Sequence, residues 1–226
     1  MFDFSVSILI PTYNRKAFEK LIEYNINNQN YKNIEGIYVA DDSDVDEHLH
    51  INTDYPIHYY KTKRVTIGEK RHFLSTLAKG KYLINFDTDD FYRPNYISHS
   101  IYTLLKYDKD CCGSADMFIL KNNEFYLQRC MYIYMLNEAT MCMTKEFYDK
   151  SSKYISRNYN ESIEFLKQNI NRLCETKMSL MCCVSHNNNT IDKNVWCKTE
   201  TKCEKPSLEL LNEYKEHIKL LSTLNI

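Results

Sequence analysis

An acidic tetrapeptide, Asp87-Thr88-Asp89-Asp90, directly follows the apolar segment 82–86. In extended chain Asp87 and Asp89 project to the same side, where two carboxylates repel each other unless a cation lies between them. Carboxylate oxygens of this kind suit Mg²⁺ or Mn²⁺, which keep coordination positions open for substrate phosphates. The alternative is a solvated turn, because Asp favours turns. The apolar segment before the carboxylates, and the aromatic residue and proline after them, favour a metal site.

A second acidic group and a basic group accompany the tetrapeptide. Asp41 and Asp42 follow another apolar segment, and their carboxylates can accept hydrogen bonds from a nucleobase N–H or from ribose hydroxyls. Lys70 and Arg71 fall in the first turn of a predicted helix, with Arg64 just before it, and can face a diphosphate. Taken alone, the acids are also compatible with a capped turn and the basic residues with a solvated helix face.

Two residues in the second half of the chain are further candidates for chemistry. Glu161 opens a predicted helix over residues 161–173. Its carboxylate is either a cap favoured by the helix dipole or a general base for an acceptor hydroxyl. His186 follows an apolar segment and begins a polar loop. A neutral imidazole can complete a metal shell, although a lone histidine is more often structural.

The elements that must position these residues alternate along the first half of the chain. Short apolar runs predict β-strands, and apolar residues at helical spacing predict helices. Strands are expected at residues 5–10, 34–40, 57–60 and 82–86, and helices at residues 17–28, 68–78 and from 94 onwards. This alternation predicts an α/β fold with a mostly parallel central sheet flanked by helices.

Polar clusters follow three of the predicted strands, at residues 12–15, 41–44 and 87–90. In mostly parallel α/β sheets, ligands bind beyond the carboxyl ends of the strands. If these strands are neighbours, the three clusters converge on one rim of the sheet. The sequence therefore predicts a single site assembled from three strand ends.

The second half of the chain has a less regular pattern. A smaller antiparallel hairpin is predicted from residues 117–120 and 125–130, and further strands at residues 140–143 and 178–184. Residues 208–221 show helical spacing of apolar side chains. The length of 226 residues favours a single domain over residues 1–226.

Composition argues against several classes of protein. With 29 basic and 30 acidic residues the formal charge is -1, so no global basic field attracts nucleic acid. No apolar run approaches the roughly 18 residues of a transmembrane span, and the N-terminus lacks the pattern of a signal peptide. Nine cysteines, an odd number, occur without a CxxC motif. We therefore expect a cytoplasmic protein with reduced thiols.

Four stretches of the sequence together resemble family 2 glycosyltransferases of the GT-A fold. They are residues 7–15 (SILIPTYNR), 39–43 (VADDS), 67–72 (IGEKRH) and 78–90 (AKGKYLINFDTDD), and their order and spacing match the family. The resemblance implies inverting transfer of a sugar from a nucleotide-diphosphate donor, usually a UDP-sugar, to a glycan or other hydroxyl acceptor. It implies Mn²⁺ or Mg²⁺ as cofactor, a nucleotide-sugar-binding half at residues 1–105 and an acceptor-binding half at residues 106–226.

The resemblance also implies the residues of the donor site. Residues 11–13 would line the base pocket, Asp42 would contact the base or ribose, and Asp41 would support Asp42. Arg71 would lie near the Asp42 side of the donor. The complete predicted donor set is Pro11, Thr12, Tyr13, Arg15, Asp41, Asp42, Lys70, Arg71, Asp87 and Thr88.

For the metal, the resemblance implies Asp89 as the main ligand, with Asp87 near the ribose and sugar. His186 precedes an Asn-Thr pair, as in a late motif of the family, which supports its role as a ligand. The family commonly carries a Glu-Asp pair at a helix start, whose Asp is the base, whereas this chain has Glu161-Ser162. In strict register Ser162 replaces the base. With a slip of one residue Glu161 is the base, and this is the assignment we adopt.

Two other functions are compatible with the sequence. A sugar-phosphate nucleotidyltransferase also combines an α/β sheet with metal-binding carboxylates, but it usually carries a Gly-rich phosphate loop, and residues 11–15 contain no glycine. A non-catalytic module that binds a nucleotide or glycan is compatible with Ser162 in place of a base. Pyrophosphate release from a nucleoside triphosphate and a sugar phosphate would indicate the former. Binding without hydrolysis or transfer would indicate the latter.

Overall fold

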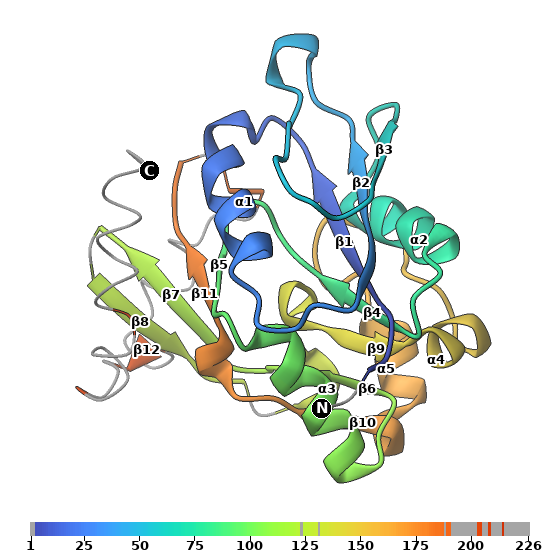
Figure 1. The fold of residues 1–226 in the computed structure, drawn as a ribbon. Helices are drawn as coiled ribbons and strands as arrows, with labels where there is room; N and C mark the ends of the chain where they lie inside the picture. The colour runs from blue at the N-terminus through green and yellow to red at the C-terminus, as the bar shows by residue number, and fades with distance from the viewer. Residues whose placement is uncertain are drawn as a thin grey trace.

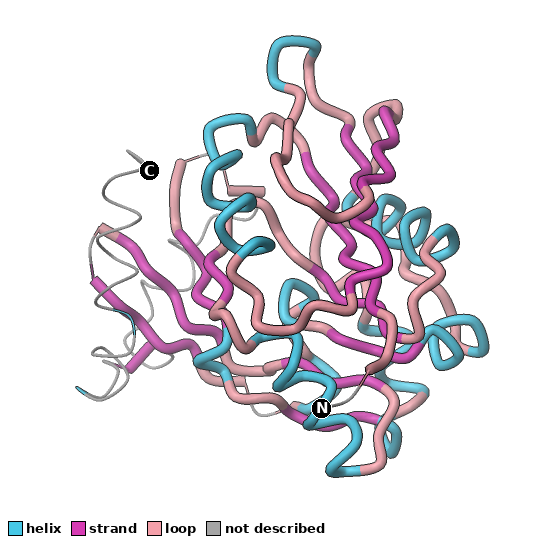
Figure 2. Tube along the Cα trace, in the orientation of Figure 1, coloured by secondary structure: helices cyan, strands magenta, loops and turns pink. Residues whose placement is uncertain are grey.

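The computed structural model describes residues 3–122, 124–130, 132–187, 189–190 and 203–204, together with Leu208 and Tyr214. Two β-sheets organise this part of the chain, with helices packed on the faces of the larger sheet (Figure 1). Figure 2 shows the same arrangement as a trace coloured by secondary structure. Within the described residues, no helix combines the length and the apolar character that crossing a bilayer requires.

The larger sheet has seven strands in the order β10-β6-β9-β4-β1-β2-β3. Six of them run parallel, since only β9 pairs antiparallel with its neighbours β4 and β6. The strands are β1 (Val6–Thr12), β2 (Ile34–Asp41), β3 (Ile57–Lys61), β4 (Tyr82–Asn85), β6 (Cys111–Gly113), β9 (Cys142–Thr144) and β10 (Leu173–Glu175). The predicted mostly parallel α/β sheet is confirmed.

Alternating side chains of the central strands feed two separate cores. Ile8 of β1 joins the core beneath α1 and α3, whereas its neighbour Leu9 joins the core beneath α2, α4 and α5. Successive residues of a strand point to opposite faces, so both faces of β1 are apolar and covered. The helices are α1 (Glu19–Asn27), α2 (Ile67–Leu77), α3 (Tyr96–Tyr107), α4 (Lys145–Lys150) and α5 (Ile163–Gln168).

The smaller sheet has the order β12-β8-β7-β11-β5 and lies beside the larger one (Figure 1). Its strands are β5 (Phe91–Tyr92), β7 (Met117–Lys121), β8 (Glu124–Gln128), β11 (Met181–Val184) and β12 (Cys203–Glu204). The hairpin of β7 and β8 is antiparallel, as predicted. Stacked rings of Phe118 and Phe125 pin this hairpin at a centroid distance of 4.9 Å.

Several predicted boundaries in the second half are wrong. The helix predicted over residues 161–173 is only α5, followed by a 3-10 turn, Ile170–Arg172. Leu173, its predicted last residue, instead begins β10 and pairs with Cys111. Asn169 and Asn171 are weak helix formers, and pairing with β6 satisfies the backbone instead. Of the helix predicted over residues 208–221, only two residues lie within the described part.

Two other strand predictions need adjustment. The strand predicted at residues 140–143 is β9, preceded by a 3-10 turn, Glu138–Thr140. The strand predicted at residues 178–184 begins only at Met181, after the 3-10 turn Met178–Leu180. Strands β6 and β10 and helix α4 were not expected. Each has six residues or fewer, so none carries a recognisable period.

Candidate active site

A cavity of about 520 Å³ opens at the carboxyl ends of β1 and β4. Most of the predicted site residues line it: Pro11, Thr12, Tyr13, Arg15, Lys70, Arg71, Asp87, Thr88, Asp89 and Glu161. Three predicted residues, Asp41, Asp42 and His186, do not line the cavity. Asp42 contacts the lining residue Lys70, His186 contacts the lining residue Asp89, and Asp41 bonds within the loop that follows β2. The polar clusters that follow β1 and β4 therefore meet at one rim of the sheet, and Asp42, from the cluster that follows β2, is connected to them through Lys70.

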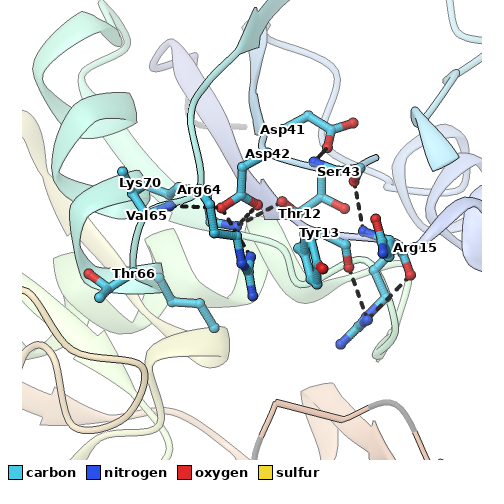
Figure 3. A network of polar contacts seen from close by, with 12 residues as sticks. Thr12, Tyr13, Arg15, Asp41, Asp42, Ser43, Arg64, Val65, Thr66 and Lys70 are labelled. Atoms are coloured by element: carbon cyan, nitrogen blue, oxygen red, sulfur yellow. Dashed lines mark hydrogen bonds and ion pairs between the residues drawn. The ribbon is translucent and has the colours of Figure 1, made fainter. Parts of the chain in front are cut away.

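Asp42 is buried behind the cavity wall with both carboxylate oxygens bonded (Figure 3). Lys70 donates to Oδ1 at 2.7 Å, and its Nζ also donates to the carbonyl of Thr12 at 2.7 Å. Oδ2 accepts from Nη1 of Arg64 and from the backbone N–H of Val65, each at 3.0 Å. Burial lowers the pKa of Lys70 despite the neighbouring carboxylate. This network ties β1, β2 and the start of α2 together.

The Arg64 guanidinium also lies 3.4 Å from the ring centroid of Tyr13. Such stacking is favourable because the face of an aromatic ring is electron-rich. The side chain of Arg64 remains 58% exposed, in contrast to that of Lys70 at 2%. Arg64 and Tyr13 therefore form an accessible planar surface above a buried ion pair.

Asp41 organises the loop that follows β2. Its Oδ1 accepts the Ser43 N–H at 2.8 Å, and its Oδ2 accepts the Leu49 N–H at 3.2 Å and the Tyr59 hydroxyl. Burial alone would raise the pKa of Asp41, but these hydrogen bonds outweigh it and lower the pKa. The contacts suit a residue that holds the Asp42 loop in shape.

The acidic loop after β4 is fixed from behind by buried polar side chains. The Asp87 N–H donates to the Tyr92 hydroxyl at 2.8 Å. Asn25 of α1 donates to the Asp90 carbonyl at 2.8 Å and accepts from the Tyr92 N–H at 3.0 Å. Because the backbone is held on both sides of Asp89, the carboxylates have a defined direction.

Two basic side chains contact the same carboxylate oxygen of Asp89. Its Oδ2 accepts from Nε of Arg15 at 2.8 Å and lies 2.9 Å from Nε2 of His186. Burial alone would raise the pKa of Asp89, but the His186 hydrogen bond and the Arg15 charge lower it to about 2. The backbone N–H of His186 donates to Oδ1 of Asn189 at 2.7 Å, and the His186 ring packs on Phe18.

Helix α2 carries two cations to different ends of the cavity. A capping box starts the helix, in which Thr66 accepts the Glu69 N–H and Glu69 accepts the Thr66 N–H at 2.8 Å. Gly68 lets the helix approach the loop over residues 155–161, because a Cβ there would lie 1.9 Å from the Ile155 carbonyl oxygen. Lys70 then contacts Asp42 at one end of the cavity, and Arg71 contacts Asp87 and Glu161 at the other.

Arg71 joins two carboxylates at that opposite end. Its Nη2 donates to Asp87 Oδ1 at 2.8 Å, and its Nε donates to Glu161 Oε1 at 2.9 Å. The guanidinium is buried, which disfavours its charge, but the charges of Asp87 and Glu161 raise its pKa well above the ordinary value. Arg71 therefore stays cationic and links Asp87 to Glu161.

Glu161 is buried in a turn before α5, and not on the helix that the sequence predicts. Burial and the negative charge of Glu138 raise the pKa of Glu161 to about 7, although Arg71 acts in the opposite direction. Glu138 also lines the cavity and was missed by the sequence analysis. It begins a 3-10 turn of three residues, which is too short for a sequence pattern to distinguish it.

The donor atoms at Asp89 fit a divalent ion that takes most of its ligands from a substrate. The 2.9 Å between Asp89 Oδ2 and His186 Nε2 is close to the spacing of about 3 Å for neighbouring ligands, each roughly 2.1 Å from an octahedral ion. In the described part of the chain, no three acidic, His or Cys side chains gather around one point. The ion would have to displace Arg15 from Asp89, and phosphate and water would complete its shell.

The family model described as "Glycosyl transferase family 2" matches residues 7–181. The match covers more than half of the chain, and the chain belongs to this family. Curated relatives agree. An uncharacterised glycosyltransferase of Rickettsia typhi is 35% identical over 138 residues, which cover 54% of this chain and 42% of that protein. Abequosyltransferase RfbV of Salmonella typhimurium is 35% identical over 94 residues, covering 38% and 28%. The chain thus spans less than half of either relative.

Solved structures share the fold at low sequence identity. Mannosyltransferase PcManGT of Pyrobaculum calidifontis, in complex with GDP-Man and Mn²⁺, has a TM-score of 0.63 at 12% identity, covering 100% of this chain and 71% of that chain. S. aureus TarS 1-349 in complex with UDP-GlcNAc has a TM-score of 0.59 at 13% identity, covering 82% and 60%. These likenesses, together with the sheet topology, confirm the predicted GT-A-like fold.

Proposed function

We propose that this chain transfers a sugar from a nucleotide-diphosphate sugar, a UDP-sugar by preference, to an acceptor hydroxyl with inversion at the anomeric carbon. The observation that carries the proposal is the meeting of Asp87, Asp89, Lys70 and Arg71 around one cavity at the strand ends. Family membership supports the same reaction class. Residues 1–105 would form the donor-binding half and residues 106–226 the acceptor-binding half.

The nucleotide would lie against the end of the cavity near Tyr13. Tyr13 and Arg64 offer an accessible planar pair on which a base can stack. Asp42 already accepts three hydrogen bonds, so it would hold Arg64 and Lys70 in place. The proposed contact of Asp42 with the base or ribose would add to this role. Pro11 and Thr12 would complete this pocket, with Thr88 beside the ribose.

The diphosphate would lie near Asp89, with Mn²⁺ or Mg²⁺ held by Asp89 and His186 and with Asp87 close to the ribose and sugar. The bound ion would neutralise charge that develops on the leaving diphosphate. Arg15, which now pairs with Asp89, would be displaced by the ion and would then pair with the same phosphates. PcManGT, which shares the fold, forms a complex with GDP-Man and Mn²⁺, and this supports the use of a divalent ion beside a nucleotide-sugar.

In the reaction, the acceptor oxygen attacks the anomeric carbon through an oxocarbenium-like transition state. The bond from that carbon to the diphosphate oxygen breaks, and its electron pair leaves with the diphosphate. The acceptor proton passes to a carboxylate in the wall of the cavity, which contributes roughly 10²–10⁴-fold. Glu161 is the base expected from sequence, and Glu138 lies in the same wall.

A thermal-shift screen of UDP- and GDP-sugars, with and without Mn²⁺, tests the proposal. A ligand that binds only the folded protein raises the melting temperature, by roughly 5–10 °C at about 100 times its Kd. We expect this shift with a UDP-sugar and Mn²⁺ together and little with either alone. If no nucleotide-sugar raises the melting temperature, the proposal fails.

Donor hydrolysis separates the transferase from a binding module. Glycosyltransferases that lack an acceptor can pass the sugar slowly to water, so we expect release of free UDP from the stabilising UDP-sugar. Stabilisation without hydrolysis or transfer would instead favour a non-catalytic module. Pyrophosphate release from UTP and a sugar phosphate would favour a nucleotidyltransferase.

A further inference from the structure

Hydrogen bonds hold the backbone around Glu138 close to the acidic loop that carries Asp87. Its carbonyl accepts from the Asn85 side chain at 2.7 Å, two residues before Asp87. The Tyr92 hydroxyl accepts the Asp87 N–H at 2.8 Å and donates to the Ala139 carbonyl at 3.0 Å. A chain of two hydrogen bonds therefore connects Asp87 to the residue after Glu138.

The Glu138 side chain is also held in one direction. Its Oε1 accepts from the Ser162 hydroxyl at 2.7 Å and from the Ser162 N–H at 3.3 Å. Ser162 is buried at 1% exposure and is the residue that precedes α5, yet its hydroxyl does not cap that helix. Among the described residues Oε2 has no hydrogen-bond partner, so one oxygen is anchored and the other is available to a ligand.

The ion pairs of the other cavity carboxylates set Glu138 apart. Asp87 and Glu161 each pair with Arg71, and Asp89 pairs with Arg15. A carboxylate oxygen that already accepts from a cation has one fewer lone pair for an acceptor hydroxyl. Within the described part of the chain, no Lys, Arg or His nitrogen lies within 4.0 Å of the Glu138 carboxylate, whose anchors are neutral donors.

Access favours the same residue. Both residues line the cavity, but Glu161 is 3% exposed and bonded to the Arg71 guanidinium, whereas Glu138 is partly exposed. A general base must come within hydrogen-bond reach of the hydroxyl that it deprotonates. Oε2 of Glu138 can accept from a hydroxyl in the cavity without breaking an ion pair, whereas Glu161 is buried and its Oε1 is bonded to Arg71.

We propose that Glu138 is the catalytic base of the transfer, with Ser162 as its positioning residue and Glu161 as the anchor of Arg71. The proposal rests on the glycosyl transfer proposed above. The acceptor O–H bond breaks, its oxygen forms the new bond to the anomeric carbon, and its proton goes to Oε2 of Glu138. The bond from the anomeric carbon to the diphosphate breaks with its electron pair on the diphosphate. Arg71 keeps its contacts with Asp87 and Glu161 throughout.

Hydrolysis of a UDP-sugar, with water as acceptor, tests this assignment without knowledge of the natural acceptor. Glu138→Gln should lower the hydrolysis rate by roughly 10²–10⁴-fold while leaving the affinity for UDP and Mn²⁺ within about twofold of wild type. Ser162→Ala should lose roughly tenfold in kcat with little change in KM. Glu164→Gln, an exposed carboxamide exchange on α5, is the matched control and should behave as wild type.

Chemical rescue distinguishes a base from a structural residue. Glu138→Ala opens space for a small carboxylate, so added formate should raise the hydrolysis rate of this variant at least tenfold. Formate should not restore Glu161→Ala, whose defect should be in donor binding because Arg71 and Asp87 lose their anchor. Melting temperatures and UDP affinity of each variant show whether its fold is intact.

The outcomes separate this proposal from the one on which it rests. If wild type hydrolyses no UDP- or GDP-sugar, the proposed function fails and the base assignment fails with it. If wild type is active but folded Glu138→Gln keeps its rate within threefold, only the assignment to Glu138 is overturned. Loss of rate in Glu161→Gln with unchanged UDP affinity, together with formate rescue of Glu161→Ala, would return the role of base to Glu161.

Discussion

The two ends of the cavity differ in how far nearby cations compensate their carboxylates. At the end proposed to bind the nucleotide, here called the nucleotide end, Asp42 accepts hydrogen bonds from Lys70, Arg64 and a backbone N–H, so its charge is compensated. At the other end Arg71 alone faces Asp87 and Glu161, and Glu138 adds a further negative charge. Helix α2 supplies a cation to both ends from consecutive residues.

This contrast separates a framework from a reactive site. A compensated ion pair holds geometry but has little tendency to bind a further proton. An excess of carboxylates over cations raises proton affinity, and the pKa of about 7 at Glu161 reflects that excess. We infer that the nucleotide end is built for shape and the acceptor end for proton transfer.

The largest effect is expected at Asp89, between the two ends. Asp89→Ala should lower turnover by roughly 10³-fold and abolish the Mn²⁺ dependence of UDP binding, because a metal contributes several kcal/mol to developing charge. Isothermal calorimetry and a hydrolysis assay measure both effects. The exposed acid Asp46 provides the control, since Asp46→Ala should change neither. Turnover of Asp89→Ala equal to that of wild type would show that Asp89 does not hold a catalytic metal.

Next in size is the framework ion pair. Lys70→Met should destabilise the fold by about 3–5 kcal/mol, because it leaves the buried Asp42 carboxylate without its closest cation. Arg64→Ala, at the other oxygen of Asp42 but 58% exposed, should cost less than about 1 kcal/mol. Urea denaturation of both variants tests the difference. Equal losses would show that the nucleotide end is not held by its buried pair.

The smallest effect is a pH dependence at the acceptor end. The pKa of Glu161 is about 7 in the fold against an ordinary value of 4.5, so the folded state binds more protons than the unfolded chain between these values. Stability from this group is therefore greatest at low pH and falls as pH rises from 4.5 to 7. The melting temperature of wild type relative to Glu161→Gln should fall over that window in metal-free buffer. A constant difference would show that Glu161 does not carry excess negative charge.

The first half of the chain was predictable because its elements are regular. Strands β1, β2 and β4 are largely apolar and are followed by polar clusters, and parallel pairing brings their ends together. The second half was predicted poorly because β6 and β10 have only three residues each. They form through pairing with distant neighbours, which no local period records.

Site residues divide in the same way. Asp87, Asp89 and Arg71 lie in stretches that resemble a family, so the sequence selected them as candidates. Arg71, however, contacts Asp87 and Glu161 and does not lie on the Asp42 side, where it was expected. Glu138 lies 24 residues from Ser162, and only the fold places the two in contact. The pairing of Arg71 with both Asp87 and Glu161 was likewise hidden, because the sequence shows charges but not which cation serves two acids.

The central claim is that Asp89 and His186 hold a cation that in turn holds a sugar-bearing diphosphate. Anomalous diffraction at the manganese edge, from a crystal soaked with Mn²⁺ and UDP, tests it most directly. We predict a single manganese peak roughly 2–2.5 Å from Asp89 and His186, with diphosphate oxygens completing its shell and Arg15 moved off Asp89. A diphosphate bound without manganese at this rim, or a rim where Asp89 still pairs with Arg15 and no peak appears, would contradict the account.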